Sequence, residues 1–428
     1  MTRRREAYYV EYGGDFGLTG LAARLCADPG PRPGARAEPA LVARTALDDG
    51  DVQLGQDVRL LLASGLPEEV LRTVWLAAVG GRFDPAAHGT DVPTWLHTVA
   101  ELCPPYDPLE RTETEQAVPE EELAAAVLAE IRSATPGLTG AGAGRDVVRS
   151  LERVVSEADA DLSLRLLLRA LKACAVPVEE VRYRRLLALG DRLAYPHTAV
   201  FEGLAVRWPP LDPGRRDFEF GFGLPGLCAM FDGEWEAWKH EGTGTPREHV
   251  ERLTRADAGM PPGVQAAVLW EDVTRLLVSG LSDEEVTALW RTAARRQRAA
   301  DAFDTDGRAW LREIAEVCTE RLAEVDPAYT PYMSPPRTDL TARVGREVQE
   351  VIAPLSAATD GDGTAAPLQE IVTSVDPDLG FRLLLRVVEA YGIPVPRSRY
   401  ARYRELGERF GYRASQVVEA VEALVTDG

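Results

Sequence analysis

Residues 378–412 read DLGFRLLLRVVEAYGIPVPRSRYARYRELGERFGY. An earlier stretch, DLSLRLLLRALKACAVPVEEVRYRRLLALGDRLAY at 161–195, is identical to it at 17 of 35 positions without a gap. In each stretch, leucines occupy nearly every side of the first predicted helix, which is typical of a helix buried at the centre of a domain. A proline ends that helix, and a second predicted helix follows with apolar residues three and four positions apart.

Three more pairs of segments repeat in the same order: 57–75 with 272–290, 94–103 with 309–318, and 10–21 with 218–227. The sequence therefore predicts a mostly α-helical protein built by tandem duplication of a unit of about 210 residues. Each unit should begin with a short aromatic, β-like segment, YYVEY in the first and DFEFGF in the second. The join is expected in RWPPLDPGRRD at 207–217, because consecutive prolines cannot continue a helix.

Each copy is predicted to contain a front and a back helical lobe. The four lobes are 1–110, 111–210, 211–330 and 331–428. The back-lobe helices are expected at 120–133, 145–157, 160–174 and 179–192, and at 338–353, 365–374, 377–391 and 397–410. The stretches 135–144 and 357–366 are rich in Gly, Ala and Thr, which predicts flexible connectors. In the front lobe of the second copy, Ser282 is the expected N-cap of a helix.

The balance of charged residues bears on partners. The formal net charge is −20, which repels the phosphates of nucleic acids and anionic membranes and attracts basic protein surfaces. Solubility is the alternative reason for such a charge. The five cysteines are scattered without a CxxC, which argues against a disulfide framework or a zinc cluster. With no long apolar run, these features predict a cytoplasmic protein that binds neither nucleic acid nor membrane.

The motifs in the sequence favour a non-catalytic protein without a cofactor. GFGLPG at 221–226 matches the glycine spacing of dinucleotide-binding loops, but no βαβ pattern follows it. DAFDTDGRAWLRE at 301–313 lacks the first ligand of a calcium loop, so helix capping by an aspartate is expected there. What the two copies share is mainly Leu, Val, Arg, Tyr, Trp and turn residues, which support folding and surface shape.

Two sets of residues are candidates for binding a partner. Arg165 and Arg169 lie four positions apart on the Leu-rich predicted helix, and Arg382 and Arg386 repeat the arrangement. They either form ion pairs with neighbouring helices or make a basic notch that receives a carboxylate of a ligand or partner. The second set is Trp235 and Trp238, which are candidates for an exposed contact. The recurring pairs Trp75/Trp290 and Trp95/Trp310, like Cys103 and Cys318, are expected in the core.

The repeated pattern itself has a known counterpart. An acid followed by L-x-L/F-R-L-L-L, a helix ending in V/I-P-V, and Y-x-x-L/Y-x-x-L-G-x-x-L/F-x-Y resembles the MafI-type immunity proteins of bacterial polymorphic-toxin systems. Members of that family usually carry more acidic residues in the first helix, whereas this chain has Arg165, Arg169 and Lys172 there. The resemblance implies an acidic helical protein that occludes a toxin, and its partner would be a basic toxin domain. The alternatives are a structural or scaffolding subunit that self-associates, and an enzyme with a cryptic site.

Overall fold

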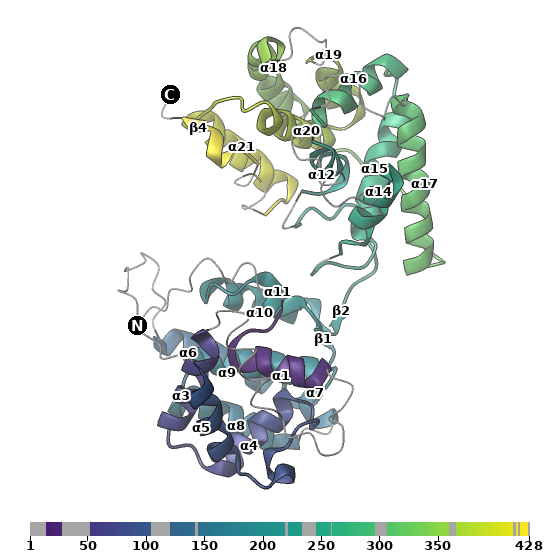
Figure 1. Ribbon diagram of the computed structural model, residues 1–428. Helices are drawn as coiled ribbons and strands as arrows, with labels where there is room; N and C mark the ends of the chain where they lie inside the picture. The colour runs from purple at the N-terminus through teal and green to yellow at the C-terminus, as the bar shows by residue number, and fades with distance from the viewer. Residues whose placement is uncertain are drawn as a thin grey trace. The chain divides into compact units, whose positions relative to one another are not determined.

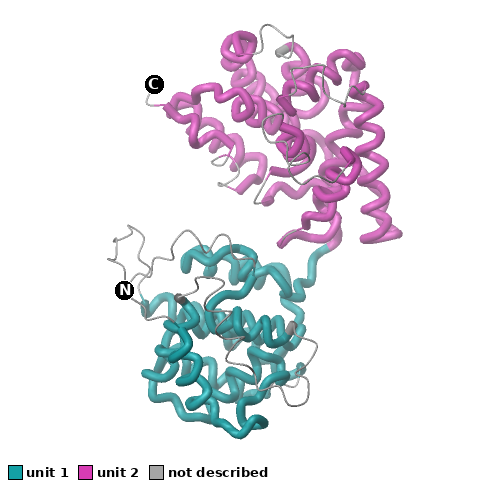
Figure 2. Tube along the Cα trace, viewed as in Figure 1, with its two compact units in different colours: residues 1–209 teal, residues 210–428 magenta. Residues whose placement is uncertain are grey.

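The computed structural model describes residues 14–27, 52–103, 120–141, 144–218, 221–232, 245–257, 259–295, 306–358, 365–413, 417 and 420–426. The chain forms two compact units, residues 1–209 and 210–428 (Figure 2). Both units are mostly α-helical in their described parts, as predicted. The boundary falls between Pro209 and Pro210, inside the predicted join.

The first unit contains helices on both sides of a central one (Figure 1). In chain order its elements are α1 (Gly17–Ala27), α3 (Val52–Ala63), α4 (Glu68–Ala78), η2 (Pro85–His88), α5 (Val92–Leu102), α6 (Glu120–Ser133), α7 (Thr135–Gly140), α8 (Gly144–Glu157), α9 (Ala160–Ala173), β1 (Val178–Glu179), α10 (Glu180–Arg192), α11 (His197–Phe201) and β2 (Val206–Arg207). Helix α9 contacts α1, α4, α6 and α8, and it is buried along most of its length, as the Leu-rich pattern predicted.

The second unit has a similar central helix, α20. Its elements are α12 (Gly223–Met230), α14 (Pro246–Arg255), α15 (Val264–Leu277), α16 (Asp283–Ala293), α17 (Gly307–Val325), η3 (Thr338–Leu340), α18 (Thr341–Ala358), α19 (Ala365–Glu370), the π-helical turn η4 (Ile371–Val375), α20 (Pro377–Ala390), β3 (Val395–Pro396), α21 (Arg397–Phe410), η5 (Glu422–Leu424) and β4 (Val425–Thr426). Helix α20 contacts α12, α16, α18 and α19 (Figure 1).

Each unit has a hydrophobic core that spans the predicted front and back lobes. In the first unit the cluster runs from Phe16 to Leu204, and in the second it runs from Phe218 to Val421. The tryptophan pairs lie in these cores as predicted, with ring centroids 4.5 Å apart for Trp75 and Trp95. Cys103 and Cys318 are also buried, as expected. Front and back segments therefore bury their apolar faces against each other within one unit.

Each unit contains one short pair of parallel strands, which the sequence did not predict. β1 pairs with β2 with Val178 opposite Val206, and β3 pairs with β4 with Val395 opposite Val425. The valines of β1 and β3 are buried directly after the prolines that end α9 and α20. Each pair holds the last described segment of its unit against the start of α10 or α21.

The expected β-like segment at the start of each unit is not a strand where the structure describes it. Residues 217–218 and 221–222 are irregular, and the rings of Phe218 and Phe222 stack 4.3 Å apart inside the core. Positions four apart in an extended strand lie about 13 Å from each other, so rings that stack at 4.3 Å do not belong to one extended strand. The YYVEY segment of the first unit lies outside the described residues.

Two predicted boundaries were wrong for local reasons. Residues 135–140 form the short helix α7 instead of a flexible connector, because Leu138 is fully buried and anchors the turn. Helix α18 continues to Ala358 and contains Pro354, although the prediction ended it at 353. Pro354 is exposed, so water can bind the helix carbonyl that loses its partner N–H.

Ser282 caps α16 as predicted, through a reciprocal capping box. Its Oγ accepts a hydrogen bond from the Glu285 N–H at 3.2 Å, and Glu285 Oε2 accepts one from the Ser282 N–H at 2.7 Å. Replacing Ser282 by alanine should lower the free energy of unfolding by about 1 kcal/mol, because a helix N–H loses its acceptor. Urea unfolding monitored by circular dichroism measures the change, and Ser282→Asp, which retains an acceptor, should remain near wild type.

Candidate functional site

A buried ion-pair cluster joins α9 to α3 and α1 in the first unit. Arg165, 2% exposed, donates from Nη1 and Nη2 to the carboxylate of Asp57, with a distance of 2.6 Å from Nη2 to Oδ1. Nη2 also lies 3.4 Å from Asp161 Oδ2, and Tyr195 Oη donates to Asp161 Oδ1 at 2.6 Å. Asp57 Oδ2 accepts the Leu18 N–H at 2.9 Å, so the same carboxylate caps the start of α1.

The second unit contains the same cluster with matching atoms. Arg382 donates from Nη1 and Nη2 to Asp272, at 2.7 Å each, and from Nη2 to Asp378 at 3.2 Å. Asp272 Oδ2 accepts the Leu224 N–H at 2.9 Å, and Tyr412 Oη donates to Asp378 Oδ1. In addition, Arg216 Nε donates to Asp378 Oδ2 at 2.7 Å.

Arg165 and Arg382 therefore lie inside internal ion pairs, which is the first of the two roles that the sequence left open for them. Their guanidinium groups also lie over buried rings, 5.0 Å from the centroid of Phe16 and 4.9 Å from that of Phe222. Moving a guanidinium group from water into the core costs free energy, and the ion pairs and ring contacts offset this cost.

The carboxyl group of Asp378 has a pKa of about 2. Burial alone would raise the pKa, but the positive charges of Arg216 and Arg382 outweigh it, and the hydrogen bond from Tyr412 acts in the same direction as these charges. A carboxyl group with a lowered folded-state pKa stabilises the fold above its unfolded value near 4, and this contribution disappears as the pH falls toward 2.

The Asp378→Asn variant should therefore lose more stability at neutral pH than at pH 2. The pH-dependent part of the difference is on the order of 2 kcal/mol, because a tenfold difference in proton affinity corresponds to about 1.4 kcal/mol. Urea unfolding of both proteins at several values between pH 2 and pH 6 measures it, with hydrogen exchange of α20 as a local readout. A stability difference that stays constant across this range would contradict the assignment.

Arg169 and Arg386 sit one turn further along the central helices, where Arg169 is 12% exposed and Arg386 is 6% exposed. Each Nε donates to the last carbonyl of a helix: Arg169 to Ala78 O of α4 at 3.0 Å, and Arg386 to Ala293 O of α16 at 2.9 Å. Cations at helix C-termini are favourable because the carbonyl ends carry partial negative charge. These two arginines therefore tie α9 to α4 and α20 to α16.

The carboxylate partners of these two arginines differ between the units. Arg169 Nη1 donates to Asp15 at 3.0 Å, and Asp15 also binds Lys172 Nζ at 2.8 Å. Arg386 instead donates from Nη2 to Asp232 at 2.5 Å and from Nη1 to Glu389 at 3.1 Å.

A cavity of about 200 Å³ opens beside Arg386 in the second unit. Two residues proposed from the sequence, Arg382 and Arg386, line it, together with Glu389 and Tyr412. Its remaining lining residues are glycines and apolar residues, and they include Phe222, Pro225, Ala229 and Leu385. A small concave site with a few charged groups and apolar walls has the character of a binding pocket.

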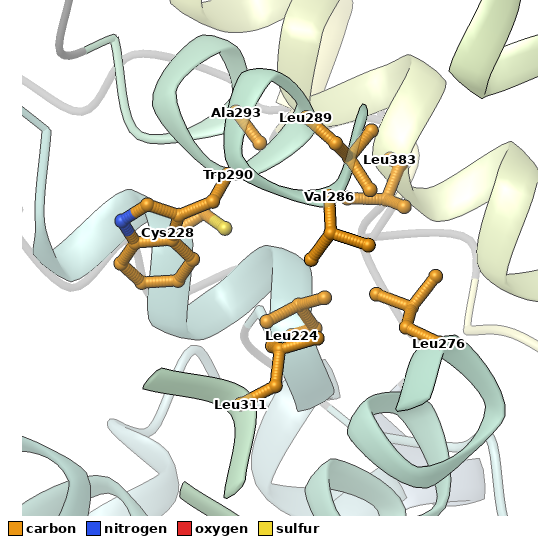
Figure 3. Close-up of a pocket in the computed structure, with 9 residues that line it drawn as sticks. All are labelled: Leu224, Cys228, Leu276, Val286, Leu289, Trp290, Ala293, Leu311 and Leu383. Carbon is orange, nitrogen blue, oxygen red and sulfur yellow. The ribbon is translucent and has the colours of Figure 1, made fainter. Parts of the chain in front are cut away.

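A second, much smaller cavity lies in the core of the same unit and is entirely apolar. It has a volume of about 10 Å³, and Leu224, Cys228, Trp290 and Leu311 are among the side chains that point into it (Figure 3). A space of this size with no polar lining does not hold a stable water molecule. Burial raises the pKa of Cys228 to about 12, so its thiol is not a nucleophile at neutral pH.

Several sequence-based expectations concern residues elsewhere in the chain. Trp235 and Trp238 lie outside the described residues, as do residues 301–305 of the segment 301–313. Asp306, in that segment, accepts a hydrogen bond from the Arg308 N–H at 2.9 Å and caps α17, as expected. Among the residues that the structure describes, no group of three His, Cys, Asp or Glu could hold a metal ion, and no helix is long and apolar enough to cross a membrane.

Sequence reasoning missed the acids that complete the clusters. Asp57 and Asp272 begin the repeated segments 57–75 and 272–290, so a shared acid at one aligned position was available as a signal. Asp15 gave no such signal, because its aligned residue is Gly221.

Comparison with protein-family models, curated proteins and solved structures finds no match for this chain.

Proposed function

We propose that this chain is a non-catalytic, acidic protein-binding module that acts as a toxin-neutralising immunity protein by occluding a basic toxin domain. We further propose that it arose by head-to-tail duplication and works in the cytoplasm. The recurrence of the Asp–Arg–Asp–Tyr cluster with matching atoms in both units supports the duplication. The resemblance of 161–195 and 378–412 to MafI-type proteins supports the toxin-binding role.

One observation carries the proposal: the cations on the central helix of the first unit are neutralised by buried carboxylates, so they do not offset the acidic charge of the rest of the chain. In the first unit, the cations Arg165, Arg169 and Lys172 are balanced inside by Asp15, Asp57 and Asp161. This cluster contributes no net charge, so the formal charge of −20 comes from the residues outside it. A strongly acidic surface accelerates association with a basic partner through long-range attraction.

The proposal predicts that a reading frame next to the gene for this chain encodes a toxin domain, and the test uses that domain. Co-expression should restore growth to cells that express the toxin domain, and the purified proteins should form a complex. Raising the salt concentration from 50 to 500 mM should lower the association rate constant at least tenfold and change the dissociation rate constant much less. Normal growth inhibition together with no detectable complex would overturn the proposal.

The scaffolding alternative predicts extended exposed apolar patches and self-association. In the described part of the chain, the large apolar side chains that are exposed are Val181, Val278, Tyr332 and Met333. Of these, Tyr332 and Met333 are adjacent, and the other two are single exposures of the kind found on ordinary surfaces. Sedimentation velocity distinguishes the two: a monomer at high concentration favours the immunity role, and reversible assembly favours the scaffold.

A further inference from the structure

The cavity beside Arg386 has a filled counterpart in the first unit. The aligned residue of Glu389 is Lys172, and the aligned residue of Gly221 is Asp15. Lys172 is buried, with Nζ donating at 2.8 Å to Asp15 Oδ1 and at 2.8 Å to Ala199 O. A Cβ placed on Gly203, which aligns with Ala420 in the cavity wall, would lie 3.9 Å from Lys172 Cδ.

The second unit has neither a lysine nor an aspartate at the positions aligned with Lys172 and Asp15. Gly221 has no side chain, and Glu389 is 45% exposed and bound to Arg386 through Oε2. The cavity thus occupies the place that a lysine side chain and its carboxylate occupy in the first unit. Two wall residues of the cavity, Phe222 and Leu385, have the counterparts Phe16 and Leu168 in the first unit.

We infer that the cavity of the second unit receives the side chain of a lysine presented by a protein partner, in the place that Lys172 fills in the first unit. The methylene groups of the lysine pack against Leu385, Pro225 and Ala229, and its ammonium group binds Glu389 at the rim. Lysine side chains bind in this way because the stem is apolar and the charge lies at the tip.

Neighbouring positive charge does not exclude an ammonium group from the cavity. Arg382 is paired with Asp272 and Asp378, and Arg386 is paired with Asp232 and Glu389. The first unit provides the precedent, since Asp15 there bridges Arg169 and Lys172 with its two oxygens. Burial lowers the pKa of Lys172, and the attraction of Asp15 opposes this effect.

Glu389 is placed to bridge in the same manner. Its Oε2 accepts from Arg386 Nη1, and within the described part of the chain Oε1 receives no hydrogen bond. A carboxylate that binds a guanidinium with one oxygen can accept from an ammonium with the other. A lysine from outside would restore the arrangement of charges that the first unit makes from its own residues.

The inference rests on the proposed function in one respect, that the partner is a protein. Its test needs only short peptides: acetylated and amidated Gly-Lys-Gly, with norleucine or glutamate in place of lysine as controls. Methyl NMR of the full-length protein should show saturable shifts of Leu385, Ala229 and Ala420 with the lysine peptide. The affinity should be in the millimolar range, at least tenfold tighter than for either control.

Two variants make the test specific. The double variant Gly221→Asp/Glu389→Lys transfers the pair of the first unit, and a Cβ on Gly221 would make only an ordinary contact, 3.4 Å from Gly226 Cα. It should remain folded and lose the lysine-dependent shifts. Glu408→Lys makes the same charge change as Glu389→Lys at an exposed position of α21 and should leave the shifts unchanged.

The outcomes separate the inference from the proposed function. Equal binding of the norleucine or glutamate peptide, no binding of any peptide, or unchanged binding by the double variant would each overturn the lysine assignment. Failure of the toxin domain to form a complex, with the peptide results as expected, would leave the lysine pocket intact and remove the immunity role.

Discussion

Replacing Arg382 by methionine should lower the free energy of unfolding of the second unit by about 3–5 kcal/mol. The methionine fills much of the same volume, but Asp272 loses both of its guanidinium hydrogen bonds and Asp378 loses one. A buried carboxylate without its cation is far more costly than a missing surface pair. Urea unfolding of the full-length protein measures the loss, and hydrogen exchange of α15 and α20 assigns it to this unit.

The matched control is Arg343→Met in the same unit. Arg343 binds Glu405 at 2.6 Å, but the two side chains are 47% and 58% exposed. An exposed pair of this kind contributes at most about 1 kcal/mol because water and salt screen it. Equal losses in the two variants would show that the buried cluster does not hold α20 to α15 and α12.

Replacing Gly223 by alanine should be nearly as damaging, at about 3–5 kcal/mol, even though it adds one carbon. Gly223 has a φ of +62°, and a Cβ on this residue would lie less than 3.0 Å from both Asp272 Oδ2 and Arg382 Nη1. That is closer than a Cβ approaches other non-bonded atoms in folded proteins. The left-handed backbone alone costs an L-residue about 1–2 kcal/mol. The remainder comes from displacement of the buried ion pair. Thermal and urea unfolding of the full-length protein give the loss.

Gly392→Ala separates the two contributions to that loss. Gly392 has a φ of +58°, and nothing lies within 4 Å of the Cβ that it would carry. Its replacement should therefore cost only the backbone contribution of about 1–2 kcal/mol. If Gly223→Ala costs no more than Gly392→Ala, the ion pair moves without penalty and the close approach has no structural importance.

Local sequence patterns predicted the central helices well. The leucines of 160–174 and 377–391 predicted buried helices, and α9 and α20 end within one residue of the expected positions. Periodicity succeeds here because one helix buried on all sides leaves a strong pattern in its own residues. The apolar residues three and four positions apart also predicted the helix that follows, and in α10 Tyr183, Leu186 and Leu187 are buried.

Long-range partners could not be predicted in this way. Arg165 and Asp57 are 108 positions apart, and Arg382 and Asp272 are 110 positions apart. A sequence shows that such an arginine needs a carboxylate, but many aspartates and glutamates could supply it. The cavity was still harder to foresee, because Gly221 and Glu389 lie at positions where the two units differ in sequence.

The two-residue strand pairs have a practical meaning for how the chain can be divided. β2 pairs with β1 and ends at Arg207, two residues before the boundary at Pro209, so the first unit completes its last backbone pairing before the prolines. Each half thus carries both members of its own pair. A gene split between codons 209 and 210 would yield two polypeptides with intact terminal ladders, whereas a split upstream of Val206 would remove one strand of the first.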